Sequence, residues 1–228
     1  MITLKSKGAK LLSRANKTVA GRLRASRALT RWVFGVRVLP GLRPQFWDYT
    51  TLVLKKALNR YGRDGARTLE VGVGESALLT LYLAKKFEVD AHGVDIDVSA
   101  LAHARTTARE NGVRVDLRVS DVFAACEGQF DLIFWNPPYV PSAAADLSLI
   151  GEQSDVQTNG GASGLDLIDR FVRDVGPYLA PGGHVLLGFS DFYLDREEVR
   201  SVVREHGLAV HEEVTARPNP SRVFVLSA

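Results

Sequence analysis

Cysteine is nearly absent from this sequence, because Cys126 is the only one in 228 residues. A single thiol cannot form an intramolecular disulfide or a zinc site built on several thiolates, so both frameworks are excluded. Long apolar runs are also missing, and none approaches the roughly 18 residues that a membrane-spanning helix needs. These absences favour a cytoplasmic protein, or an organellar one if the N-terminal segment is a transit peptide.

Metal-binding and serine-hydrolase patterns are missing too. The five histidines do not have the spacing of metal ligands, and no Gly-x-Ser-x-Gly elbow is present. We therefore expect no metal site. We assign none of these histidines to catalysis: His92, His103, His184, His206 and His211.

Acidic residues are absent up to Trp47, whereas this segment holds eleven lysines and arginines. Apolar residues recur in it at roughly helical intervals, which predicts a basic amphipathic helical arm over residues 1–43. Such an arm suits contact with RNA or the ribosome, a membrane surface, or organelle import. The alternative is a helical lid whose basic face is simply solvated.

The remaining residues, 44–228, read as one α/β domain. Short strand-like runs alternate with helical periods from Ala66 onward, which predicts a parallel sheet with helices on both faces. The expected strands are 68–71, 89–95, 113–119, 130–135, 184–189, 209–214 and 223–226. The expected helices are 77–87, 99–111, 165–179 and 196–206.

A glycine turn follows the first of these strands, where Gly72 and Gly74 permit close backbone approach to a ligand. Asp95 ends the next strand, the expected place for a carboxylate that binds ribose hydroxyls. Both features also occur in nicotinamide-dependent oxidoreductases. Glu70, however, stands just before the glycines, where it would repel a diphosphate and attract a cation. Asp121 ends the third strand, so three successive strand ends carry acids, which favours S-adenosylmethionine.

The tetrapeptide Asn136-Pro137-Pro138-Tyr139 follows the fourth predicted strand. An Asn side-chain carbonyl and the Pro137 backbone carbonyl are two adjacent acceptors, which can hold the two hydrogens of a planar NH₂ group. Tyr139 can stack on the flat face of that group. Alone, the tetrapeptide is also an ordinary turn. With the three acids, it predicts attack by an amide or amine nitrogen on a sulfonium methyl group.

These residues resemble class I S-adenosylmethionine-dependent methyltransferases, specifically the HemK/PrmC group that methylates glutamine amides of release factors. The similarity covers about Pro44 to the C-terminus. It is carried by Asn136–Tyr139 and by Glu70–Gly74, Gly93–Asp97, Asp121–Phe123 and Phe130–Ile133. A weaker likeness lies at Thr50-Thr51-Leu52.

The resemblance implies a Rossmann-like seven-stranded sheet whose last strand is antiparallel. It implies a cofactor-binding set, a catalytic set that holds the acceptor nitrogen, and no metal. The cofactor-binding residues are Thr51, Glu70, Gly72, Gly74, Asp95, Asp121 and Val122. The catalytic residues are Asn136, Pro137 and Tyr139. Apart from the resemblance, Pro138, Phe46 and Trp47 are candidates for substrate binding, and Phe46 and Trp47 could cover the site and exclude water.

The acceptor stays open at this point. Glu75 and Ser76 depart from the usual glycine loop, and the basic arm does not resemble the release-factor recognition domain of bacterial members. The tetrapeptide is shared with enzymes that methylate exocyclic amines of nucleic-acid bases. A protein glutamine is the first expectation; an rRNA or DNA base and a small molecule are alternatives. A nicotinamide-dependent oxidoreductase or a non-catalytic nucleic-acid-binding module explains fewer of these residues.

Overall fold

The computed structural model describes residues 26–39, 47–140, 161–216 and 218–227. Its seven strands form one sheet in the order β3-β2-β1-β4-β5-β7-β6. β7 is antiparallel to both β5 and β6, whereas the pairs from β3 to β5 are parallel. The predicted seven-stranded sheet with an antiparallel last strand is therefore confirmed. The strands are β1 (Arg67–Val71), β2 (Asp90–Asp95), β3 (Asp116–Val119), β4 (Phe130–Trp135), β5 (Leu179–Ser190), β6 (Ala209–Thr215) and β7 (Ser221–Ser227).

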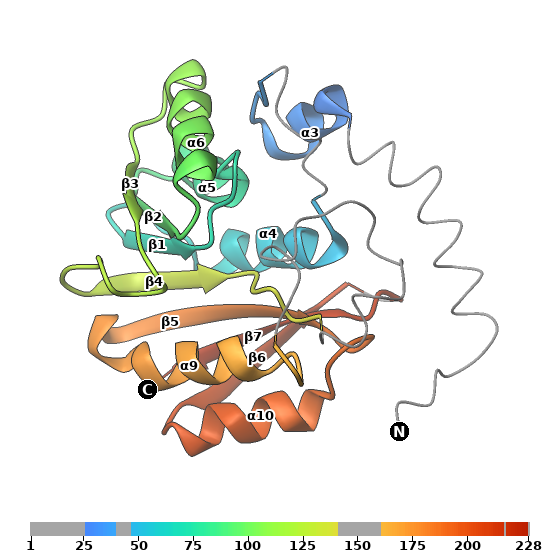
Figure 1. Cartoon of the computed structure of the whole chain (residues 1–228). Helices are drawn as coiled ribbons and strands as arrows, with labels where there is room; N and C mark the ends of the chain where they lie inside the picture. Colours follow the sequence, from blue (N-terminus) through green and yellow to red (C-terminus); the bar gives the residue numbers. More distant parts are fainter. Residues whose placement is uncertain (1–25, 40–46, 141–160, 217, 228) are drawn as a thin grey trace.

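Helices cover both faces of this sheet (Figure 1). One layer holds α4 and α5, with α3 and α6 packed beside them, and the other holds α9 and α10. No helix among the described residues is long and apolar enough to cross a membrane. The helices are α3 (Arg27–Phe34), α4 (Tyr49–Tyr61), α5 (Leu78–Lys86), α6 (Val98–Glu110), α9 (Asp166–Asp174) and α10 (Arg196–Glu205).

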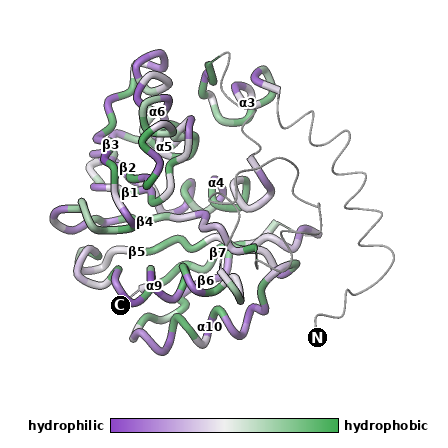
Figure 2. Tube along the Cα trace, in the orientation of Figure 1, coloured by the Kyte–Doolittle hydropathy of each residue, from purple (hydrophilic) through white to green (hydrophobic). Residues whose placement is uncertain are grey.

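The central strand β4 shows why both layers form. Leu132 and Phe134 pack into the core under α4 and α5, whereas Ile133 and Trp135 pack into the core under α9 and α10. Successive side chains of a strand point to opposite faces, so a continuous apolar run needs a helical layer on each side. In Figure 2, the green colour of hydrophobic residues runs along much of the central strands.

Two of the predicted boundaries differ from the structure for local reasons. β3 begins at Asp116 instead of Val113, because the Val113 N–H returns to the Ala108 carbonyl and closes the end of α6. The predicted helix 165–179 ends at Asp174, and a 3₁₀ turn over Gly176–Tyr178 follows it. Proline disfavours helical backbone in the residue before it, so Pro177 accounts for this early end.

Helix α4 was not expected from the sequence. Asp48 caps its first turn by accepting a hydrogen bond from the Thr51 N–H. Thr50, Thr51 and Val53 are β-branched and lower its helix propensity, which weakens the local signal. Packing supplies the stability instead, because Val53, Leu54, Ala57 and Leu58 are buried in the core.

The described part of the basic segment packs against the domain. Phe34 at the end of α3 is 2% exposed, and Lys55 on α4 donates a hydrogen bond to the Val33 carbonyl. Arg27 and Arg31 lie on the exposed side of α3. Residues 1–25 and 40–46 lie outside the described residues, so the boundary at residue 43 and the function of the arm stay predictions.

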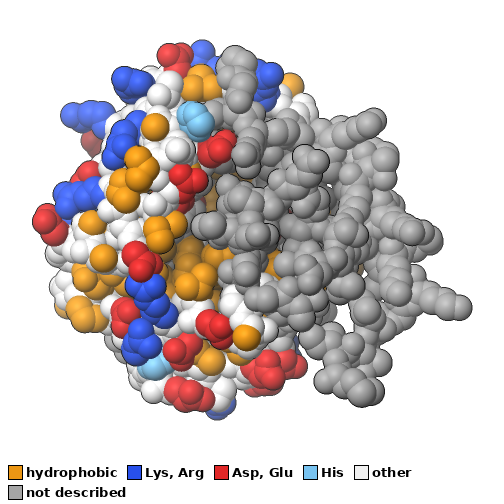
Figure 3. All heavy atoms as spheres, in the orientation of Figure 1, with side chains coloured by type: hydrophobic (Ala, Val, Ile, Leu, Met, Phe, Trp, Pro, Cys, Tyr) orange, Lys and Arg blue, Asp and Glu red, His pale blue; other side chains and the backbone are white. Residues whose placement is uncertain are grey.

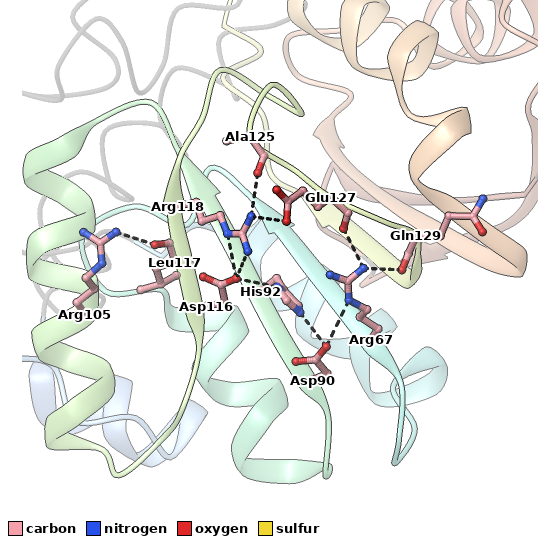
Figure 4. Close-up of polar contacts among 10 residues, drawn as sticks. All are labelled: Arg67, Asp90, His92, Arg105, Asp116, Leu117, Arg118, Ala125, Glu127 and Gln129. Atoms are coloured by element: carbon pink, nitrogen blue, oxygen red, sulfur yellow. Dashed lines mark hydrogen bonds and ion pairs between the residues drawn. The ribbon is translucent and has the colours of Figure 1, made fainter.

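A polar network crosses the sheet beneath the β3–β4 connection (Figure 4). We call it the sheet-face cluster: Arg67, Asp90, His92, Asp116, Arg118 and Glu127. His92 lies between two carboxylates, 2.9 Å from Asp90 and 3.4 Å from Asp116, while each arginine pairs with at least one acid. Basic and acidic side chains are also interspersed over the described part of the face in Figure 3.

Candidate active site

The carboxyl ends of four neighbouring parallel strands meet at one edge of the sheet. Strand pairing aligns Val71 at the end of β1 with Val94 of β2 and Trp135 of β4. It also aligns Asp95 with Val119 of β3. The glycine turn and the three residues Asp95, Asp121 and Asn136 therefore lie along the same edge, where open α/β sheets bind ligands.

The glycine turn bends back over β2. Gly72 and Gly74 have φ angles of 68° and 60°, a region that side chains other than glycine rarely adopt. The N–H groups of Gly72 and Val73 both donate to the Val94 carbonyl, at 2.8 and 3.1 Å. A Cβ at Gly72 would lie 3.2 Å from the Trp135 indole nitrogen. The backbone therefore favours glycine at both positions, and a side chain at Gly72 would also crowd Trp135.

Asp95 ties the turn to the loop after β2. Its Oδ2 accepts from the Gly74 N–H at 2.8 Å, and its Oδ1 accepts from the Asp97 N–H at 2.9 Å. Each carboxylate oxygen has two lone pairs, so each retains capacity for a ligand hydroxyl. The side chain is thus held in place while it can still receive two hydrogen bonds.

Glu70 is buried at the end of β1, with 6% exposure. Its Oε2 accepts from the backbone N–H of Thr80 at 2.9 Å and from the Thr80 hydroxyl. These bonds cap helix α5, whose own N-cap residue Ala77 offers no side-chain acceptor. Burial raises the pKa of Glu70 to about 8, and the charge of Asp95 adds to the increase. A cation bound beside Glu70 would favour its charged form.

Asp121 follows β3 and pairs with an arginine that the sequence reasoning did not assign to the site. Arg170 on α9 donates to both carboxylate oxygens, at 3.0 and 2.8 Å. A groove of about 430 Å³ extends from this pair toward Phe123 and Tyr178. Val122 lines it with a φ of 51°, which is strained backbone for a β-branched residue.

Asn136 and Tyr139 meet α4. The Asn136 side-chain nitrogen lies 3.5 Å from Asp48 Oδ1, and the Tyr139 hydroxyl donates to Asp48 Oδ2 at 3.3 Å. Tyr139 also shares a 3.0 Å hydrogen bond with the Thr50 hydroxyl. We call Asp48, Thr50, Asn136 and Tyr139 the acceptor cluster. Burial raises the pKa of Tyr139 well above its ordinary value, and the charge of Asp48 adds to this, so its phenol stays protonated.

The acceptor cluster leaves one polar atom without a partner. Asn136 Oδ1 is inaccessible to solvent, and no donor among the described residues reaches it. An unmet buried acceptor costs free energy on the order of 1–3 kcal/mol, so it is expected where a ligand completes the site. The Asn136 side-chain nitrogen faces the Asp48 carboxylate, which leaves the Asn136 carbonyl oxygen free. That oxygen can accept a hydrogen bond from an N–H group of a ligand.

The structure places the other predicted residues as follows. Pro137 is buried and Pro138 is half-buried in the same loop. Thr51 donates to Asp48 through both its N–H and its hydroxyl. Trp47 donates its indole N–H to Thr30 at 3.0 Å and packs against Phe34, so the structure gives it contacts with α3. Phe46 lies outside the described residues.

Asp48, Thr50 and Arg170 are the site residues that sequence reasoning missed. Asp48 carries a local signal, because aspartate is a preferred helix N-cap residue. Nothing local connects it with Asn136, which follows 88 residues later. Among the described residues, no group of three or more His, Cys, Asp or Glu side chains could hold a metal ion.

Comparisons with known proteins show which family the chain resembles. Residues 45–153 match the methyltransferase small domain family. The chain is 31% identical over 166 residues to a putative protein N5-glutamine methyltransferase of Methanocaldococcus jannaschii, covering 73% of this chain and 80% of that protein. It is 35% identical to the release factor glutamine methyltransferase of Koribacter versatilis, covering 60% of this chain but only 50% of that enzyme.

Solved structures share the fold. A methyltransferase from Pyrococcus furiosus aligns with a TM-score of 0.65 at 21% identity, over 92% of this chain and 97% of that one. The Thermus thermophilus 16S rRNA N2 G1207 methyltransferase, in complex with AdoMet and guanosine, aligns with a TM-score of 0.57 at 21% identity, over 84% and 45%. The chain therefore belongs to the HemK/PrmC family of S-adenosylmethionine-dependent methyltransferases.

Proposed function

We propose that this enzyme transfers a methyl group to the side-chain amide nitrogen of a glutamine in a protein. The unpartnered Asn136 Oδ1 carries the proposal, because a buried acceptor at the end of β4 calls for an N–H donor. A primary amide offers two such hydrogens on a planar nitrogen. The names of the relatives, all similar over much of the domain, support a glutamine amide as that group.

The cofactor side of the site fits the donor that the family uses. S-adenosylmethionine supplies, when bound, an electrophilic methyl group on a cationic sulfur. Gly72 and Gly74 leave the backbone open to it, and a Cβ at Gly72 would crowd Trp135. We assign the buried Glu70 to the cationic methionine part and Asp95 to the ribose hydroxyls. Asp121 and Val122 border the adenine, with Arg170 holding the Asp121 carboxylate.

The acceptor side acts through geometry. Asn136 Oδ1 and the Pro137 carbonyl would accept the two N–H groups of the amide, which fixes the direction of its nitrogen lone pair. Nitrogen gains positive charge as its new bond to carbon forms, so acceptors aimed at its hydrogens stabilise the transition state more than the ground state. Tyr139 and Pro138 would form the walls of this pocket. Thr51 contributes by holding Asp48 in place.

The remaining assignments belong to the same proposal. Residues 44–228 form the catalytic domain, and residues 1–43 form the basic arm, for which an anionic or ribosomal partner suits the charge. We assign Phe46 and Trp47 to substrate binding, and Trp47 also donates a hydrogen bond to Thr30 on α3. A cytoplasmic location suits both the single cysteine and a translation-factor substrate.

The test uses the full chain, S-adenosylmethionine labelled on the methyl group, and a purified release factor as the methyl acceptor. The expected result is labelled N5-methylglutamine, identified in a proteolytic digest by mass spectrometry. A control release factor carries methionine at the labelled glutamine and should take up no label. Transfer to ribosomal RNA, shown by label that nuclease releases, would overturn the proposal and favour a base amine.

A further inference from the structure

Asp48 joins three parts of the site that are distant in sequence. Its Oδ1 accepts from the Thr51 N–H at 2.7 Å and from the Thr51 hydroxyl at 2.8 Å, which fixes the carboxylate at the start of α4. The same Oδ1 lies 3.5 Å from the Asn136 side-chain nitrogen, and Oδ2 accepts from the Tyr139 hydroxyl at 3.3 Å. Asp48, the N-cap of α4, thus contacts the side chains of Asn136 and Tyr139 in the loop after β4.

These contacts decide which end of the Asn136 amide is left without a partner. The NH₂ end points to Asp48, so the carbonyl end is the one that remains unpartnered. Rotating the amide by half a turn would bring its oxygen against the Asp48 carboxylate. Neither atom carries a hydrogen to share, so that orientation is repulsive. Asp48 therefore holds Asn136 as a hydrogen-bond acceptor.

The charge of Asp48 acts in the same direction. Among the described residues, Asp48 has no cationic partner in an ion pair, and its side chain is half-buried. Burial raises the pKa of Tyr193, and the negative charge of Asp48 raises it further, as it does for Tyr139. Negative potential therefore extends across the acceptor cluster to Tyr193. It favours a group that presents N–H and disfavours a carboxylate.

We propose that Asp48 is a positioning residue that makes the site select an amide over the corresponding carboxylate, by fixing Asn136 as an acceptor. This rests on the proposed function, since it names the residue that enforces the chemistry of the acceptor. It also predicts that the side-chain amide of Asn136 is held in one orientation, whichever amide is methylated.

Three variants separate the possible roles. Asp48→Ala removes both the cap and the contact with Asn136. Asp48→Asn keeps a carbonyl oxygen that can replace Oδ1 toward Thr51 and Asn136, but it removes the charge. Asp195→Ala is the matched control, because Asp195 caps α10 by accepting from Glu197 and Glu198. Both alanine variants lose one N-cap, so each should lower Tm by about 2–4 °C.

The first measurement is hydrogen exchange of the Asn136 side-chain amide, followed by NMR on protein labelled with ¹⁵N-asparagine. Asn136→Asp removes this signal and so assigns it. We expect exchange to be about tenfold faster or more in Asp48→Ala, and near wild type in Asp48→Asn and Asp195→Ala. Unchanged exchange in Asp48→Ala would overturn the positioning role, even if wild type methylates no release factor.

The second measurement is kcat and competition on the release factor. We expect kcat to fall about 10- to 100-fold in Asp48→Ala, to recover mostly in Asp48→Asn and to stay unchanged in Asp195→Ala. The competitor is a release factor with glutamate in place of the glutamine, and it competes with the glutamine form for the enzyme. Its affinity relative to the glutamine form should be at least tenfold higher for Asp48→Ala than for wild type. Equal competition would overturn the selectivity. An inactive wild type would instead overturn the proposed function alone.

Discussion

The acceptor cluster and the sheet-face cluster both place polar side chains against a largely apolar sheet. They differ in how fully these side chains find hydrogen-bond or ion-pair partners. In the sheet-face cluster each charge has an opposite partner, and Arg67 also donates to two backbone carbonyls and lies over the Phe130 ring. In the acceptor cluster, Asn136 Oδ1 lacks a donor among the described residues. The first network is complete without a ligand and the second is not.

An acid of the sheet-face cluster and the buried acid at the end of β1 also have pKa values shifted in opposite directions. The hydrogen bond from His92 lowers the pKa of Asp90 in the sheet-face cluster, and the charge of Arg67 adds to this. At the end of β1, burial raises the pKa of Glu70 to about 8. Partners that lower the pKa of Asp90 stabilise its charged form, whereas a buried carboxyl with a raised pKa is poised to respond to a bound cation. The difference predicts distinct responses to mutation.

Replacing Asn136 should give the largest effect. Asn136→Ala removes the acceptor that orients the amide, so we expect kcat to fall about 10²- to 10³-fold. The affinity for S-adenosylmethionine and Tm should change little, because the Asn136 side chain makes only one weak hydrogen bond to the other described residues. Calorimetric titration with the cofactor provides the control. Loss of cofactor binding in parallel with kcat would assign Asn136 a structural role instead.

Cofactor binding should depend on pH through Glu70. Because the pKa of the free protein is raised to about 8, binding a cation beside Glu70 below that pH must release a proton. Affinity should therefore increase with pH, by at most about tenfold per unit, and level off above pH 8. Titration calorimetry in two buffers of different ionisation enthalpy counts the proton. Glu70→Gln should abolish both the release and the pH dependence.

The same carboxyl has a predictable effect on stability. Its folded pKa is raised above its unfolded value, so its contribution is fully present below about pH 4.5 and is lost as the pH rises through 8. Thermal melts of Glu70→Gln should lose this part of the pH dependence. Identical pH profiles for the variant and wild type would contradict the assignment of a raised pKa to Glu70.

Replacing Gly72 should give an intermediate effect. Gly72→Ala strains a backbone with φ of 68° by about 1–2 kcal/mol and places a Cβ 3.2 Å from Trp135. Gly112→Ala is the matched control, because Gly112 has a φ of 65° but no atom within 4 Å of its Cβ position. Both variants should lose Tm, and only Gly72→Ala should also weaken cofactor binding. Equal cofactor affinity in the two would show that the turn tolerates a side chain.

Breaking the sheet-face cluster should give the smallest effect. Arg118→Gln removes ion pairs with Asp116 and Glu127 that are open to solvent, where water and salt screen the charges. We expect Tm to change by about 2 °C or less and kcat to stay unchanged. A large loss of kcat with an unchanged Tm would mean that this network also takes part in the reaction.

The fold could be predicted largely from local patterns. The β4 run Phe130–Trp135 was assigned with its observed bounds, since a continuous apolar stretch bounded by turn residues is a strong local signal. The place of Asn136 at the end of that strand followed directly. Helix α4 was missed because its threonines and valine give a weak helical signal, while its burial, which stabilises it, depends on the sheet.

Sequence alone determined which chemical groups stand at the carboxyl ends of the strands, because strand ends follow from local periodicity and glycine. It therefore indicated that Glu70, Asp95, Asp121 and Asn136 stand at strand ends of one parallel sheet, and the observed strand order β3-β2-β1-β4 makes them neighbours along one edge. Tertiary structure decided what each group can do. Only packing places the cap of α4 against the loop after β4, and only burial raises the pKa of Glu70, because both depend on contacts between residues distant in the chain.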